Sequence, residues 1–325
     1  MKIIDMHCDT LMALQEKKQN GLPFTFKTSD TQVNLANMAD SHYMLQNFAV
    51  FVDTGSADDP FEHAMRMISL YYGQLEQHAD MIAPAYTYDD IIKNDRAGKM
   101  TALLTLEEGG ICKGEPEFLD ILYRLGARMM TITWNYENEL GFPNVSRGEE
   151  WNRPGEFSRR GLKEKGLIFL EEMERLGMII DVSHLSDAGF YDVLDHTKKP
   201  FVASHSNARS VCSAMRNLTD DMIRKLADRG GVAGINFCQD FLGTPEKGKN
   251  YLQQAVKHMK YLVNVGGEDF VGLGSDFDGI PPYDDFKDCR VVPLLADYMK
   301  KEGFSYRQIE KIFFQNVLRL YRDLL

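Results

Sequence analysis

The chain lacks a run of apolar residues long enough to cross a bilayer, which would need roughly 18 of them. It also lacks an apolar signal segment near its start, where His7 and Asp9 stand instead. Clusters of Lys and Arg are missing, and the net charge of -11 argues against a polyanionic partner. We therefore expect neither a membrane nor a nucleic acid as a partner.

Cysteine is scarce and follows no pattern. The five Cys are an odd number without CxxC spacing, which favours reduced thiols over a disulfide framework and indicates a cytoplasmic protein. No linker, repeat or low-complexity segment interrupts the chain. With 325 residues, 44% of them hydrophobic, it can bury one large core. We expect a single domain over residues 1–325.

Short segments of strand composition alternate with segments of helical periodicity. The expected strands cover residues 3–6, 43–52, 102–107, 127–133, 178–183, 201–204, 232–236 and 270–275. The clearest helices cover 60–78, 162–176, 187–196, 219–229, 251–265 and 305–321, with Thr219 and Ser305 as N-caps. This alternation predicts an α/β fold, a TIM-type (β/α)8 barrel, with long loops after strands four, seven and eight.

Side chains that bind metals follow several of these strands. His7 and Asp9 follow the first strand and, because side chains alternate, point to the same side. Four others follow strands three, five, six and eight: Glu108, His184, His205 and Asp276. The C-terminal ends of barrel strands meet at one mouth, so the sequence predicts a divalent-metal site of the metal-dependent hydrolase kind.

A set of motifs in a fixed order strengthens this prediction. The motifs are His7-Cys8-Asp9, Glu108-Gly109-Gly110, Asp181-Val182-Ser183-His184, Ala203-Ser204-His205-Ser206-Asn207, Arg216-Asn217 and Gly274-Ser275-Asp276-Phe277-Asp278-Gly279. Together they resemble the membrane (renal) dipeptidase family, the M19-type metallopeptidases, over almost the whole chain. The resemblance implies a barrel that holds two zinc ions and hydrolyses dipeptides, including those with a D-residue at the C-terminal position. The family's membrane anchor is not expected, because the chain ends in a charged helix.

The chemistry requires an anionic group between the two ions. A hydroxide bridging two divalent ions about 3.5 to 4 Å apart is available at pH 7, and the ions also polarise the carbonyl. A carboxylate can bridge such ions because it has one oxygen for each. His7 and Asp9 would complete one ion, and His184 and His205 the other.

Two adjacent carboxylates compete for the bridging position. Glu107 and Glu108 must face opposite ways on a strand. The Gly-Gly that follows Glu108 matches the family pattern, so we expect Glu108 to be the bridging ligand.

Two further roles follow from the resemblance. Asp276 resembles the family's proton shuttle, whereas Asp278, two residues later, could instead hold an Asp-Gly turn. Arg216 resembles the anchor of the substrate carboxylate, since a guanidinium fork suits that planar group, and its neighbour Asn217 is expected to contact the substrate.

Trp134 is a departure from the family. Many relatives have a His at the end of strand four, which reaches the carbonyl oxygen, whereas an indole donates one hydrogen bond and carries no proton charge. We expect Trp134 to line the substrate pocket. A replacement donor could come from Asn135, Tyr136 or Asn138 on the following loop.

The sequence therefore predicts a cytoplasmic metallodipeptidase with a dipeptide substrate. A dinuclear amidohydrolase acting on N-acyl amino acids, lactones or β-lactams would need the same metals and the same anchor, and the sequence does not separate the two. A barrel that binds without turnover is disfavoured by Asp276, since binding needs no acid there. The side-chain and stereochemical preference, the metal identity and the oligomeric state, a homodimer included, stay open.

Overall fold

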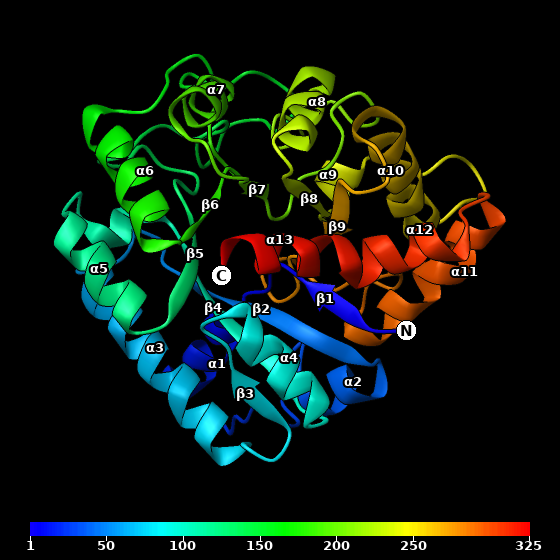
Figure 1. The fold of residues 1–325 in the computed structure, drawn as a ribbon, viewed down its shortest axis with the longest axis horizontal. Coiled ribbons are helices and arrows are strands. Elements are labelled where there is room, and N and C mark those ends of the chain that lie inside the picture. The colour runs from blue at the N-terminus through cyan, green and yellow to red at the C-terminus, as the bar shows by residue number, and fades with distance from the viewer.

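All strands of the protein belong to one parallel sheet. The computed structural model describes residues 1–325, and its sheet has the order β2-β1-β9-β8-β7-β6-β5-β4-β3 with a further pairing of β2 with β4. The strands are β1 (Ile3–Asp5), β2 (Tyr43–Phe51), β3 (Ile82–Pro84), β4 (Met100–Glu107), β5 (Ala127–Thr131), β6 (Ile179–Asp181), β7 (Val202–Ala203), β8 (Val232–Ile235) and β9 (Val271–Leu273). The β2–β4 pairing closes eight strands into a ring, so the expected TIM-type barrel is confirmed (Figure 1).

The short strand β3 was not expected from the sequence and lies outside the ring. It pairs only with the start of β4, where Pro84 is opposite Ala102, while β5 takes the same side of β4 from Leu104 onward. Proline cannot donate to a sheet and is therefore found at edges. This strand extends the N-terminal end of the barrel and takes no part in the mouth.

Helices surround the ring of strands (Figure 1). They are α1 (Thr10–Gln19), α2 (Leu35–Asp40), α3 (Pro60–Gln77), α4 (Tyr88–Arg96), α5 (Pro116–Arg124), α6 (Glu164–Leu176), α7 (Asp187–His196), α8 (Asp220–Asp228), α9 (Gln239–Leu242), α10 (Tyr251–Gly266), α11 (Leu295–Lys301), α12 (Tyr306–Glu310) and α13 (Asn316–Leu324). Shorter turns are the 3-10 helices η1 (Gly109–Cys112) and η2 (Cys289–Leu294), and the π-helix η3 (Lys311–Gln315) joins α12 to α13. The expected N-caps are confirmed: Thr219 accepts from the N–H of Met222, and Ser305 forms a capping box with Gln308.

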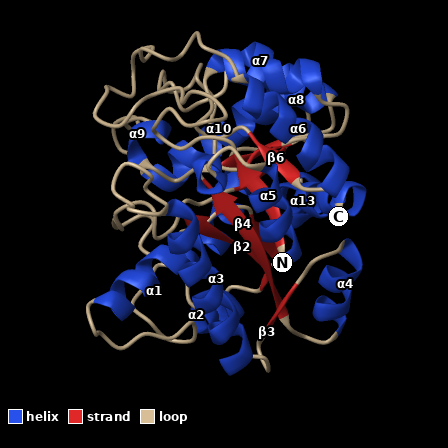
Figure 2. Ribbon diagram, turned by 90° about the vertical axis from the view of Figure 1, so that its left-hand side faces the viewer, coloured by secondary structure: helices blue, strands red, loops and turns tan.

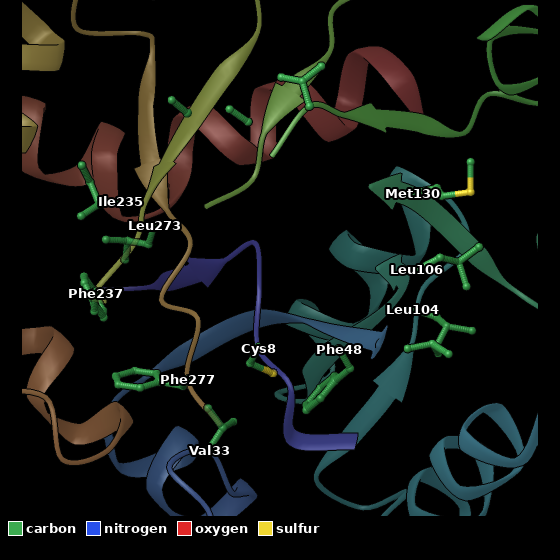
Figure 3. Packing of buried hydrophobic residues seen from close by; sticks show 14 of the residues in the cluster. Cys8, Val33, Phe48, Leu104, Leu106, Met130, Ile235, Phe237, Leu273 and Phe277 are labelled. Carbon is green, nitrogen blue, oxygen red and sulfur yellow. The ribbon is translucent and has the colours of Figure 1, made fainter. Parts of the chain in front are cut away.

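The main core lies between the strands and the outer helices. It joins 71 buried residues, part of which Figure 3 shows, including Leu106, Phe237 and Phe277. Cys8 points into this core beside Phe48, and its thiol donates to the carbonyl oxygen of Asn47. Since side chains alternate here, His7 and Asp9 point to the opposite side, toward the barrel axis.

A second core closes the N-terminal end of the barrel. Residues from the starts of seven ring strands pack there against Val317, Leu320 and Tyr321 of α13. The Tyr321 hydroxyl donates to Oδ1 of Asn47 inside the barrel, 2.9 Å away. The long loops collect at the other end, opposite α13 (Figure 2). The mouth at the C-terminal ends of the strands is therefore the open end of the barrel, where active sites of this fold lie.

Candidate active site

A buried cluster of imidazoles and carboxylates lies at the mouth of the barrel, and Glu107 is at its centre. Oε2 of Glu107 lies 3.2 Å from Nε2 of His7, and Oε1 lies 3.1 Å from Nε2 of His184 and 3.7 Å from Nε2 of His205. Oδ2 of Asp9 lies 3.3 Å from Nε2 of His7. Oε2 of Glu107 thus faces His7, which contacts Asp9, and Oε1 faces His184 and His205.

The strand register explains why Glu107 occupies this position. Glu107 is the last residue of β4 and pairs with Phe51 at the end of β2 and with Thr131 at the end of β5. His184 and Asp276, which follow their strands, have positive φ angles of 69° and 65°. Residues other than Gly rarely adopt this backbone region. Such strained turns are typical of functional sites.

The glycine at position 279 allows the chain to approach two of these carboxylates. A Cβ added to Gly279 would lie 2.2 Å from Oδ2 of Asp9 and 2.9 Å from Oδ1 of Asp276. The turn after β9 therefore packs directly on both acidic groups.

Two of the donor atoms are buried without a hydrogen-bond partner. They are Nε2 of His7 and Oδ1 of Asp9. Asp9 stands at the N-cap position of α1, yet its side chain caps no backbone N–H and turns to the cluster instead. Unpaired buried polar atoms cost about 1 to 3 kcal/mol each, so their occurrence at one point indicates a missing ligand.

The other pair of donors has the protonation state that a metal requires. Nδ1 of His184 lies 2.9 Å from Oδ1 of Asn135, an atom that only accepts, so the ring proton is on Nδ1 and Nε2 is bare. Nδ1 of His205 lies 2.7 Å from the hydroxyl of Ser204, which itself donates to Asp181. Nε2 of His205 is therefore bare as well.

The bare Nε2 atoms of His184 and His205 lie 2.9 Å apart. Burial holds the pKa of both rings well below the ordinary value, so both are neutral. Two bare nitrogens facing one another repel unless a cation binds both. The donor types suit divalent metal ions: ligand atoms of His7, Glu107 and His205 all lie within 4.8 Å of one another, as do those of His7, Asp9 and Asp276.

The structure contradicts the expectation for Glu108. Its carboxylate faces the loop after β5, where it accepts from the backbone N–H groups of Gly110 (2.6 Å) and Trp134 (2.8 Å) and from the side-chain amide of Asn138. Burial raises the pKa of Glu108 to about 7. The two glutamates do face opposite ways, but Glu107 faces the mouth, and Glu108 at φ 100° anchors the loop.

Asp276 belongs to the cluster, and Asp278 does not. Oδ1 of Asp276 lies 3.8 Å from Nε2 of His7, while Oδ2 accepts from the amide of Asn236 at 2.9 Å. Asp278 accepts from the backbone N–H groups of Gln32 and Val33 and from the hydroxyl of Thr10. It therefore ties distant segments to the turn after β9, whereas the sequence suggested that it holds the Asp-Gly turn itself.

A cavity of about 380 Å³ opens beside the cluster. Among the residues of the cluster that line this cavity are Glu107, His184 and Asp276. Both Trp of the chain, Trp134 and Trp151, line it. Trp134 packs edge-on against Phe51 with ring centroids 4.8 Å apart, so it lies in the pocket wall as expected.

Arg216 is buried near the same centre and is weakly paired. Its guanidinium donates to the hydroxyl of Ser206 and to the carbonyl of His205, each at a distance of 3.4 Å. Its Nε has no partner. Its Cζ lies 5.3 Å from the ring centroid of Phe241, which lines the cavity, whereas Arg216 itself does not. Much of its capacity to donate is therefore unused.

Asn217 has no access to the cavity, contrary to the expectation. Its side-chain amide donates to the carbonyls of Cys212 and Phe241, and its Oδ1 accepts from the N–H of Asn207. All of these partners are backbone groups. Asn217 thus joins the loop that carries Arg216 to Phe241 of α9, and its amide is used by backbone groups.

The chain has no helix that is both long and apolar enough to cross a membrane.

Comparison with known proteins gives the family. The family model described as membrane dipeptidase, peptidase family M19, matches residues 1–324. An uncharacterized dipeptidase of Schizosaccharomyces pombe is 30% identical over 338 residues, which cover 99% of this chain and 80% of the relative. The chain belongs to peptidase family M19. The resemblance to this family that the sequence suggested is therefore confirmed.

Other relatives of this M19 chain agree. An uncharacterized protein of Klebsiella pneumoniae is 35% identical over 236 residues, 71% of this chain and 85% of the relative. The crystal structure of a metallopeptidase from Rhodobacter sphaeroides, bound to a phosphinate mimic of the dipeptide L-Ala-D-Ala, superposes with a TM-score of 0.89 at 24% identity. That superposition covers 100% of this chain and 99% of the other, which shows a common fold.

Sequence reasoning missed three functional features of this M19 chain. The first is Glu107, which the register of β4 places at the centre of the cluster. The second is the contact of Asn135, which the sequence suggested only as an oxyanion donor, with His184. The third is the pair of Asp53 and Arg147 on the cavity wall, 94 residues apart in the chain.

Proposed function

We propose that this protein is a metallodipeptidase that holds two divalent ions, with zinc preferred. His7 and Asp9 would bind one ion, His184 and His205 the other, and Glu107 both. The observation that carries this proposal is the position of the Glu107 carboxylate between two pairs of donors. Imidazole and carboxylate ligands suit zinc. Ions bound there would lower the pKa of a water to near neutrality and polarise the scissile carbonyl.

Support for a dipeptide substrate comes from the relatives. The S. pombe relative is called a dipeptidase, as is one from Claviceps purpurea that is 28% identical over 286 residues, and the R. sphaeroides structure holds a dipeptide mimic. A cavity of about 380 Å³ fits a small substrate.

Asp276 would move the proton. Asn236 occupies Oδ2 of Asp276, which lines the cavity, so Oδ1 would accept a proton from the attacking water. The same oxygen would then deliver this proton to the nitrogen of the leaving amine, so that the carboxylate is regenerated. Burial raises the pKa of Asp276, which makes it a stronger base than an exposed carboxylate.

Asn135 is the best replacement for the missing oxyanion donor. Asn138 is occupied by Glu108 and the carbonyl of Ile132, and Tyr136 does not line the cavity. Asn135 lines the cavity, uses Oδ1 on His184 and leaves its Nδ2 without a protein partner. The two N–H bonds of this amide would stabilise the developing negative charge on the carbonyl oxygen.

Arg216 would bind the C-terminal carboxylate of the substrate. A buried guanidinium with long hydrogen bonds gains more from a carboxylate than one already paired. The clamp would limit the substrate to two residues, because a third residue would have to pass beyond it.

A cytoplasmic location remains part of this proposal, supported by the five free cysteines. The homodimer stays a prediction.

The test is elemental analysis of the purified protein, with a panel of dipeptides assayed by release of amine. We expect about two divalent ions per chain and cleavage of dipeptides. Full metal occupancy without cleavage of any dipeptide, together with hydrolysis of an N-acyl amino acid or a lactone, would establish the alternative amidohydrolase.

A further inference from the structure

The wall of the cavity opposite Arg216 carries an ion pair. In the ring of eight strands β2 and β7 are diametrically opposite, since four steps separate them in either direction. Asp53 follows β2, and Arg216 contacts His205 and Ser206, which follow β7. Asp53 pairs with Arg147, which belongs to the loop after β5. A substrate held at one end by Arg216 would extend toward this pair.

Arg147 is held in place but is not saturated. Its Nη1 donates to Oδ2 of Asp53 and also to the hydroxyl of Tyr136, at a distance of 3.1 Å. Its Cζ lies 5.8 Å from the ring centroid of Trp134, and its backbone N–H donates to the carbonyl of Asn135. The side chain is 55% exposed, and Nε and Nη2 make no hydrogen bond within the protein. A second anion can therefore bind without displacing Asp53.

Arg147 is also the sole cation on the cavity wall. The other charged side chains there are all carboxylates: Asp9, Asp53, Glu107 and Asp276. With the C-terminal carboxylate held by Arg216, an acidic side chain on the substrate would be repelled by these carboxylates or compete with them for the metals, except where it meets Arg147. A pre-organised guanidinium favours a carboxylate in particular, because it offers two parallel N–H donors.

We propose that Arg147 makes the enzyme selective for dipeptides whose N-terminal residue has an acidic side chain. Asp53 would pair with the α-ammonium group, which every dipeptide has, and Arg147 would bind the side-chain carboxylate. This inference rests on the proposed function, in which Arg216 holds the C-terminal carboxylate.

The test compares Glu-Ala with its neutral isostere Gln-Ala, and with Ala-Glu and Ala-Ala. For the wild type we expect kcat/KM for Glu-Ala to exceed that for Gln-Ala by about 10- to 100-fold, mostly through KM. The ratio should fall to about one or below in Arg147→Gln and recover in part in Arg147→Lys. Because each ratio is taken within one variant, a general loss of activity does not affect it.

The contradicting results are distinct from failure of the proposed function. Equal kcat/KM for Glu-Ala and Gln-Ala in the wild type would overturn the inference, as would a preference for Ala-Glu or a Glu-Ala preference that survives in Arg147→Gln. If no dipeptide is cleaved at all, the proposed function fails. Binding of the two reduced-amide analogues, in which a CH2–NH group replaces the peptide bond, then still decides the inference by calorimetry: equal affinity would refute it.

Discussion

Oδ1 of Asn135 lies 2.9 Å from Nδ1 of His184, and this contact fixes which nitrogen of the imidazole is free to bind a metal. The same side chain lines the cavity with its Nδ2 unpaired. In the proposed function, Asn135 would therefore have two separable tasks, one for each end of its amide.

The variant Asn135→Asp separates these tasks. An aspartate still accepts the Nδ1 proton of His184 but has no N–H for the oxyanion. We expect the metal content to be retained and kcat to fall by about 10²- to 10³-fold with little change in KM. The control Asn135→Ala should lose both tasks and also weaken metal binding by about 10- to 100-fold. Full kcat in Asn135→Asp would exclude Asn135 as the oxyanion donor.

Replacement of Asp276 tests the proton transfer. In Asp276→Asn the amide cannot take a proton, so kcat should fall by roughly 10² to 10⁴ while the metals stay bound. Asp278→Asn is the matched control, since the carboxylate of Asp278 accepts from Thr10, Gln32 and Val33 and is not part of the cluster. Its kcat should stay close to that of the wild type. Equal losses in both variants would point to a folding effect in place of catalysis.

Arg216 should act on substrate binding. Arg216→Met keeps an unbranched apolar chain in the buried site but loses the charge. We expect KM for a dipeptide with a free carboxylate to rise by about tenfold to a hundredfold. KM for the amidated dipeptide should hardly change, because it has no carboxylate to lose. If the wild type already cleaves both forms equally well, Arg216 is not the anchor.

The stability should depend on pH through His258, which is not part of the cluster. Its Nε2 donates to the carbonyl of Leu242, its Nδ1 accepts from Ala208, and burial lowers its pKa to about 4. The unfolded state, with a pKa near 6.5, takes up a proton first as the pH falls. The contribution of the neutral ring is thus full above pH 6.5 and is lost between about pH 6.5 and 4.

Urea unfolding at pH 7 and pH 5 measures this contribution. The difference in unfolding free energy between the wild type and His258→Gln should shrink by about 2 kcal/mol at the lower pH. Effects of the other groups cancel in this comparison. A difference that does not change with pH would contradict a neutral buried His258.

Much of the fold could be predicted because its signals are local. The helix from Asp187 to His196 has the predicted limits, and the caps at Thr219 and Ser305 are one-residue features that sequence shows directly. The strand β3 was missed because three residues ending in Pro84 carry almost no periodicity.

At the centre of the cluster, the expectation named Glu108 where the structure has Glu107. Alternation correctly indicates that Glu107 and Glu108 face opposite sides, but it does not say which side is the mouth. That depends on the register of β4 against β2 and β5, a long-range property. Glu108 was chosen because two glycines follow it. The structure shows that Glu108 itself has a positive φ and turns away from the mouth.

Contacts made by the loops could not be predicted. Asn217 was expected at the substrate because it follows Arg216, yet its amide is fully used by backbone groups brought together in the fold. The contact of Asn135 with His184 and that of Arg147 with Asp53 join different loops and leave no spacing in the sequence.

The metal content of two neighbouring variants tests the central claim most directly. Glu107→Gln and Glu108→Gln make the same chemical change at adjacent positions, and inductively coupled plasma mass spectrometry counts the ions that each retains. We predict about two ions per chain in the wild type, a large loss in Glu107→Gln, and near-normal content in Glu108→Gln, whose lesion is a loosened loop. Normal metal content in Glu107→Gln with loss of both ions in Glu108→Gln would contradict this account of the centre.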